Sequence, residues 1–284
     1  MAGFFGLFNY EKEGPGIDKN APKKKTFIVF FETFFRNFWK FISINLIYTL
    51  ISLPILTNGI ASAGITNVAR NTARDKHSFG LSDFFETIKK NWKQALPAGI
   101  INTVLYIVLF FDAYFFYATE GFMGTVGLGI TLFALLIFTM MNFYMWTLMI
   151  TFKFSLKQIY INSLRFSIIS LFKNFGCFFS IVAVYAVLLG IMVVAFKFFS
   201  IKGFLFTLTI VILIYVLFYP SFKFLLIQYF TFPSIKKHII DPYYAEHPNE
   251  DIERRKSLGL DIGEDDDEEG DEDGTDDEEL IFND

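Results

Sequence analysis

The chain has 284 residues, 53% of them hydrophobic and 39 of them Phe, with a mean hydropathy of +0.43 and a formal net charge of −4. This balance excludes an ordinary soluble domain, because such a domain has too little interior to hide so much apolar surface. The single cysteine, Cys177, excludes an internal disulfide and a metal cluster built from thiolates.

Residues 1–37 form a basic N-terminal segment that leads into the first of five apolar runs. Each run is long enough, or nearly so, for a helix that crosses the bilayer, which takes about 20 residues. The third run is the clearest, since 32 residues without a charge lie between Glu120 and Lys153. The five runs are 41–69, 94–111, 121–152, 174–196 and 203–222.

The first run, 41–69, has basic residues on both flanks, so a single crossing would place basic sequence on both sides of the membrane. Pro54 and Gly59 indicate a helix break inside it, after which the chain returns as a short helix of small residues. This helical hairpin, or re-entrant element, is our preferred interpretation. The alternative is a single crossing with an external N-terminus.

Basic residues follow the first run, and we predict that they form a cytoplasmic basic surface. Within this region, residues 82–96 place Phe84, Ile88 and Trp92 at helical spacing. This is the pattern of an amphipathic helix on the inner leaflet. The predicted basic surface comprises Arg70, Arg74, Lys89, Lys90 and Lys93.

Asp112 ends the second apolar run and is the one acidic residue near membrane depth. A charge there is costly, so Asp112 is a candidate intramembrane polar site for a proton, a cation or a buried base. The alternative is an aspartate at the outer interface. Tyr114 and Tyr117 favour that alternative, because aromatic residues form belts at the membrane surface.

Residues 153–172 predict a second cytoplasmic amphipathic helix, which would anchor at the interface or dock a partner. Pro220 predicts a kink in the last apolar run. Residues 233–260 form a basic cytoplasmic segment. The apolar stripe of the amphipathic helix is Leu156, Tyr160, Leu164, Ile168 and Leu171.

The last 24 residues, 261–284, hold 15 Asp or Glu and no Lys or Arg, whereas the preceding residues carry a net charge of +11. We expect this acidic tail to be disordered, because a block of like charges repels itself and buries nothing. The prediction for the whole chain is an all-α, polytopic helical membrane bundle. Its membrane domain, 38–232, has five spanning helices, a short broken or re-entrant helix and cytoplasmic amphipathic helices.

Three stretches make the chain similar to a known family: GFFGLFNYEKEGPGIDKNAPKKK at 3–25, LPILTNGIASAGIT at 53–66 and SDFFETIKKNWKQAL at 82–96. They resemble the YesL-like family of bacterial membrane proteins, whose domain has no assigned function. The resemblance extends loosely to about residue 232, through KQIYINSLRF at 157–166. It implies a bacterial plasma-membrane protein encoded near sugar ABC transporters and polysaccharide-degrading enzymes. The acidic tail departs from the family pattern.

No catalytic, cofactor-binding or metal-binding residues are predicted, because the sequence has no phosphate-binding loop, Ser/His/Asp set or paired carboxylates. We therefore expect a non-enzyme without a cofactor. The resemblance implies an accessory role in oligosaccharide uptake by an ABC transporter. Its partners would be membrane lipids and ABC transporter subunits and not nucleic acid; the oligomeric state stays open. The alternative is a small-solute transporter or channel, with Asp112, the Pro54–Gly59 break and the Pro220 kink along its path.

Overall fold

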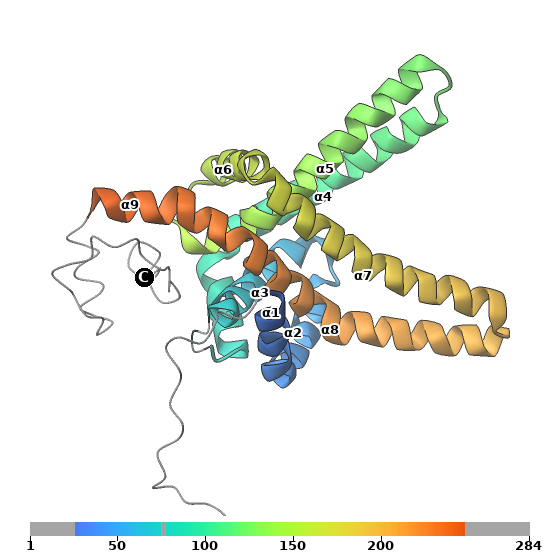
Figure 1. Cartoon of the computed structure of the whole chain (residues 1–284), viewed down its shortest axis with the longest axis horizontal. Helices are drawn as coiled ribbons and strands as arrows, with labels where there is room; N and C mark the ends of the chain where they lie inside the picture. Colours follow the sequence, from blue (N-terminus) through green and yellow to red (C-terminus); the bar gives the residue numbers. More distant parts are fainter. Residues whose placement is uncertain (1–25, 75, 77, 248–284) are drawn as a thin grey trace, which may run out of the picture.

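The computed structural model describes residues 26–74, 76 and 78–247, and all regular secondary structure in these ranges is helical (Figure 1). The acidic tail and residues 1–25 of the N-terminal segment lie outside the described residues, so their predicted structure is not addressed. A 3₁₀ turn, η2 (Ile55–Thr57), and a π-helical turn, η3 (Lys236–Ile240), join longer helices. The α-helices are α1 Thr26–Arg36, α2 Phe38–Ser52, α3 Asn58–Ala73, α4 Leu81–Ala118, α5 Phe122–Thr151, α6 Leu156–Ile169, α7 Leu171–Phe198, α8 Ile201–Ile235 and α9 Asp241–Glu246.

Two long helical hairpins, α4–α5 and α7–α8, diverge from a shared base that contains α1, α2 and α3 (Figure 1). Large apolar side chains along the hairpins are exposed, among them Phe133 at 64% and Phe206 at 69%. Such an exposed surface suits lipid rather than water. The molecule is therefore a helical membrane protein in its fold class.

Four helices are long and apolar enough to cross a membrane: Leu81–Ala118, Phe122–Thr151, Leu171–Phe198 and the continuous stretch Ile201–Glu246. Five were expected. The remaining apolar helix, α2, has 15 residues, fewer than the roughly 20 that a straight crossing takes. The last stretch also runs through the predicted domain boundary at 232–233, because η3 and α9 continue α8.

The first apolar run is broken at Pro54, as predicted. Pro54 has an extended backbone, with φ −72° and ψ 112°, between α2 and η2. The Thr57 hydroxyl donates to the carbonyl oxygen of Pro54 at 2.8 Å and also bonds Ile51, so it satisfies carbonyls that the end of α2 leaves free. After α3, Gly80 lies against Lys40, with 3.1 Å between its Cβ position and Lys40 Cγ. The chain thus returns to the start of α2, which agrees with the preferred helical hairpin.

Gly59 is the second residue of α3, and the sequence predicted it at the start of the short returning helix, 59–69. A Cβ on Gly59 would lie 2.6 Å from Gly99 Cα in α4, closer than any real Cβ contact. The two glycines therefore let the α3 and α4 backbones touch, as small residues do in membrane helix pairs. This contact fixes the hairpin against the first long span.

Residues 82–96 and the second apolar run form one helix, α4, although two separate helices were expected. Pro97 lies within this helix. It lacks the N–H that would donate to the carbonyl one turn earlier, and α4 continues past it. Phe84 is fully buried, while Trp92 remains 47% exposed. The start of α4 therefore packs against α3 rather than lying alone on a leaflet.

The second amphipathic helix is present as α6, and a capping box formed by Ser155 and Gln158 starts it. Its predicted stripe divides, however. Tyr160 is partly buried, whereas Leu164 and Ile168 are 42% and 60% exposed. Half of the stripe thus packs on the protein and half is available to lipid. Whether either amphipathic segment faces the cytoplasm is not tested by the fold.

Candidate functional site

A cavity of about 330 Å³, lined by both polar and apolar side chains, lies between the two hairpins and the base. Six helices contribute to it: α2, α3, α4, α5, α7 and α8. A concave site of this size, lined by aromatic side chains and a few polar groups, is the usual form of a small-ligand site. The polar lining contains Asn58, Asn102, Asn142, Tyr185, Tyr219 and Lys223.

One wall of the cavity is an amide and hydroxyl network on α4 and α5. Asn102 Nδ2 donates to Asn142 Oδ1 at 2.7 Å, and the Tyr160 hydroxyl donates to Asn102 Oδ1 at 2.8 Å. Asn142 Nδ2 in turn points to the Tyr106 hydroxyl at 3.4 Å. Burial raises the pKa of Tyr160 to about 12, so this hydroxyl stays a donor at neutral pH. The bonds hold both amides in fixed orientations at the cavity wall.

A second part of the wall comes from the broken hairpin. The Tyr48 hydroxyl of α2 donates to Asn58 Oδ1 of α3 at 3.2 Å, across the break at Pro54. Because Gly59 and Gly99 bring α3 and α4 into contact, Asn58 lies beside the amide network of α4. Pro54 does not line the cavity, but the break that it creates places Asn58 there.

The third wall, on α7 and α8, carries polar groups without partners. The Tyr219 hydroxyl is buried and makes no hydrogen bond to any described residue. Its ring stacks at 4.9 Å on Tyr215 and lies 4.9 Å from Tyr185. One turn further, Lys223 Nζ lies 4.8 Å from the centroid of the Phe224 ring. No described carboxylate forms a salt bridge with Lys223.

Asn45 of α2 bonds the backbone of α8 beside this wall, next to Pro220. Asn45 is fully buried; its Nδ2 donates to Leu217 O at 2.6 Å, and its Oδ1 accepts from Ser221 N at 2.8 Å. Leu217 O and Ser221 N–H are partners in a regular α-helix. The Asn45 amide therefore bridges the ladder next to Pro220, which lacks an N–H of its own. Pro220 is buried inside α8 and adjoins the cavity residue Tyr219.

Asp112 does not belong to the cavity. It is exposed on the outer part of α4, ten residues beyond Asn102, which corresponds to about 15 Å along a helix. Tyr114 and Tyr117 beside it are 71% and 78% exposed. The structure thus separates Asp112 from Pro54, Gly59 and Pro220, which lie around the base.

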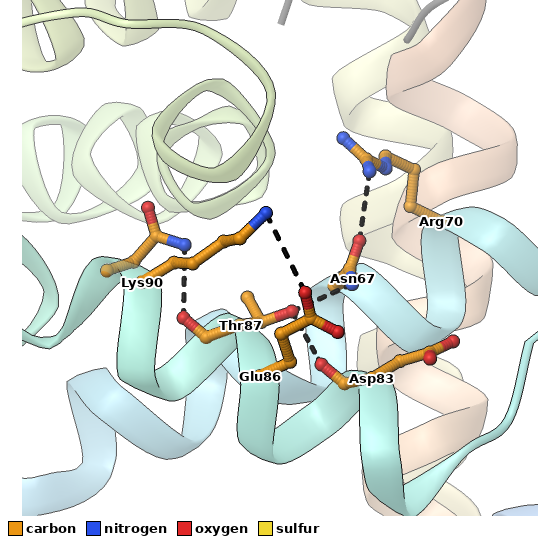
Figure 2. A network of polar contacts seen from close by, with 7 residues as sticks. Asn67, Arg70, Asp83, Glu86, Thr87 and Lys90 are labelled. Carbon is orange, nitrogen blue, oxygen red and sulfur yellow. Dashed lines mark hydrogen bonds and ion pairs between the residues drawn. The ribbon is translucent and has the colours of Figure 1, made fainter. Parts of the chain in front are cut away.

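The predicted basic surface divides into buried and exposed members. Arg70 donates to Thr151 Oγ1 at 2.8 Å, which joins α3 to α5. It also donates to Asn67 Oδ1 at 2.9 Å (Figure 2). Arg74 is only 4% exposed and stacks on the Phe232 ring at 4.0 Å. These two arginines therefore hold helices together instead of forming a surface, because their hydrogen bonds and ring contact point inward.

Lys89, Lys90 and Lys93 do lie on the surface, on the first turns of α4. Lys90 is 3.7 Å from Glu86, an exposed pair one helical turn apart. Figure 2 shows this pair beside Asn67 and Thr87, which bond each other at 2.7 Å between α3 and α4. The exposed pair contributes little to stability, since solvent screens it.

Replacing Arg70 with Ala is expected to lower the free energy of unfolding by about 2 kcal/mol, because two hydrogen bonds from a charged group are lost. Lys89→Ala is the matched control, since Lys89 is an exposed base that makes no such contact. Thermal unfolding in detergent, followed by circular dichroism, measures both. Equal melting temperatures for the two variants would contradict the structural role of Arg70.

The four apolar helices and the intramembrane cavity define a polytopic helical membrane protein. Residues 41–113 match a family model described as "Protein of unknown function, DUF624". The matched part runs from α2 through α3 into α4 and so includes the broken hairpin, Asn58 and Asn102. No curated protein and no solved structure matches the chain.

Proposed function

We propose that this protein is a non-enzymatic, multi-pass plasma-membrane protein that binds a small hydroxyl-rich solute as an accessory to carbohydrate uptake. The observation that carries the proposal is the cavity wall formed by Asn102 and Asn142. Each amide oxygen accepts one hydrogen bond within the protein and can accept a second from a solute hydroxyl group, whereas both amide nitrogens already donate to protein acceptors. Trp146 and Tyr106 add aromatic surface to the same cavity. A volume of about 330 Å³ suits a solute of the size of one or two sugar rings.

Finer assignments belong to the same proposal. We assign the chain to the YesL-like, bacterial proteins on the strength of its sequence resemblance, and the match to a family of unknown function is compatible with this. Basic residues in the α5–α6 connection, on α6 and around η3 favour a cytoplasmic location for these parts and for the C-terminus. The residues concerned are Lys153, Lys157, Arg165, Lys236 and Lys237.

The proposed partner is a subunit of an ABC transporter. A hollow of about 540 Å³ on the surface is lined by Lys90, Lys93 and Lys153, where α4 meets the α5–α6 connection. Such a basic hollow favours an acidic partner surface. Membrane lipids would cover the exposed apolar faces of the hairpins, and we propose no contact with nucleic acid.

Solute binding is tested with the full-length protein purified in lipid nanodiscs and a panel of mono- and disaccharides. A solute at one hundred times its Kd should stabilise the fold by about 2.7 kcal/mol, which is visible as a higher melting temperature. Asn142→Ala should abolish the shift, because it removes a polar group of the cavity wall. Asp112→Asn, outside the cavity, should retain it. The proposal fails if no sugar or sugar derivative in the panel raises the melting temperature.

A second candidate function is a small-solute transporter in its own right. The cavity lies beside the helix break at Pro54, and Pro220 lies next to the cavity inside the continuous helix α8; secondary transporters bind their substrates next to broken helices. Uptake of a bound sugar into proteoliposomes that contain only this protein would favour the transporter. Binding without uptake, together with co-purification of an ABC subunit in mild detergent, would favour the accessory.

A further inference from the structure

Two donor groups of α8, the Tyr219 hydroxyl and the Lys223 ammonium, line the same cavity. Tyr219 and Lys223 are four residues apart, so they lie on one face of the helix. The Tyr219 hydroxyl has no hydrogen-bond partner among the described residues. The ammonium of Lys223 has the Phe224 ring as its recorded contact.

No acidic side chain of the described residues faces this pair. The cavity lining contains amides, hydroxyls, aromatic and aliphatic groups but no Asp or Glu. An ammonium in such a place is costly unless an anion accompanies it, because burial removes its hydration. Intramembrane cations without counterions commonly mark a ligand site.

We infer that the cavity binds a hydroxyl-rich monocarboxylate, with the carboxylate on Lys223 and Tyr219 of α8 and the hydroxyl groups on the amides of α4 and α5. This inference rests on the proposed solute binding and names the class of solute. Lys223 and Tyr219 are both donors, so their common ligand is an acceptor. A single ammonium balances a single negative charge, which favours a carboxylate over a phosphate dianion.

The opposite wall supplies what the rest of such a solute needs. The amides of Asn102 and Asn142 are held at 2.7 Å from each other, and each of their oxygens can accept one further hydrogen bond from a solute hydroxyl group. A sugar acid carries a carboxylate at one end and hydroxyl groups along its ring, which matches the division of the cavity into a donor wall and an amide wall. Neutral sugars would use the amide wall alone.

Isothermal titration of the nanodisc-embedded protein with glucuronate and with glucose tests the inference. Wild type should bind glucuronate about ten- to hundredfold more tightly than glucose, the factor that a hydrogen bond to a charged group gives. Lys223→Met should remove this preference, so that its affinities for glucuronate and glucose become equal. Tyr219→Phe should weaken glucuronate binding less, and Lys89→Met, an exposed control, should change neither affinity.

A separate readout shows that Lys223→Met is folded. Without ligand, its melting temperature should equal or exceed that of wild type, because no partner is lost and a buried charge is removed. Equal affinity of wild type for both compounds, or a preference that survives in Lys223→Met, overturns the inference but leaves solute binding in place. Absence of binding by both compounds counts against the proposed function itself.

A lipid headgroup is the other source of an anion for this site, so the lipid composition of the nanodiscs is varied as well. The titration is repeated in phosphatidylcholine alone and with added phosphatidylglycerol. Unchanged glucuronate affinity supports a free solute. A loss of affinity that Lys223→Met abolishes would show that a lipid headgroup occupies the site, and this would overturn the inference.

Discussion

Replacing Gly59 with Ala is expected to lower the free energy of unfolding by about 3 kcal/mol or more, although Ala is the better helix former. The added methyl group would lie 2.6 Å from Gly99 Cα and against the carbonyl oxygen of Ala95. All these neighbours are backbone atoms, so no side chain can rotate away. The α3 and α4 helices would have to separate, and Asn58 would move away from the amide wall. Thermal unfolding in detergent measures the loss.

Gly190→Ala is the control, because it makes the same change in another long helix. Gly190 lies in α7 with nothing within 4 Å of its Cβ position. The variant should be as stable as wild type or more stable by up to about 1 kcal/mol, the difference in helix propensity. If Gly→Ala lowers stability at position 59 and raises it at position 190, the loss at 59 comes from the backbone contact and not from helix propensity. Equal melting temperatures for both variants would rule out a close α3–α4 contact.

Asn45→Leu is expected to destabilise the protein by about 4 kcal/mol, because it leaves two buried backbone groups of α8 without partners. These are the Leu217 carbonyl and the Ser221 amide, which Asn45 bonds at 2.6 and 2.8 Å. Loss of the bridge should also disturb Tyr219 and Lys223, so solute binding should weaken together with stability. Chemical unfolding in detergent and titration calorimetry measure the two effects.

Ser43→Leu is the matched control on the same helix, since Ser43 is exposed and bonds only Trp39 O of its own helix. It should change stability little. A double-mutant cycle with Pro220→Ala adds a second check. Without the proline ring, α8 can close its own ladder, so Asn45→Leu should cost less in that background. Strict additivity of the two substitutions would contradict the bridge.

The broken hairpin was predictable, because basic residues on both flanks favour a chain that returns to the same side of the membrane. A proline inside the apolar run marks where it turns. Pro54 ends α2 as expected. The close contact of Gly59 with Gly99 was not predictable, since no pattern in the sequence shows which part of α4 lies against the start of α3. The continuity of α4 was missed for a similar reason. The first part of α4 carries charged residues and the second part is apolar, but this change shows where each part lies and does not mark the end of a helix.

The cavity was not predicted from the sequence, because the candidate polar site was chosen by its charge. Asp112, the charged residue near membrane depth, is exposed outside the cavity, whereas Asn102 and Asn142 carry no charge and are 40 residues apart. Polar amides in otherwise apolar runs were the available signal, since such residues in membrane helices need partners. Lys223, three residues after Pro220 in the last apolar run, was a further signal. No pattern in the sequence places it opposite the amides.

The interior position of Cys177 simplifies the mapping of topology in intact cells. This thiol is fully buried in a cluster with Tyr144 and Phe166. A membrane-impermeant maleimide should therefore not label Cys177, so single cysteines can be introduced without first replacing it. Single cysteines at the exposed positions Tyr117 and Lys89 would then report which compartment each end of α4 meets.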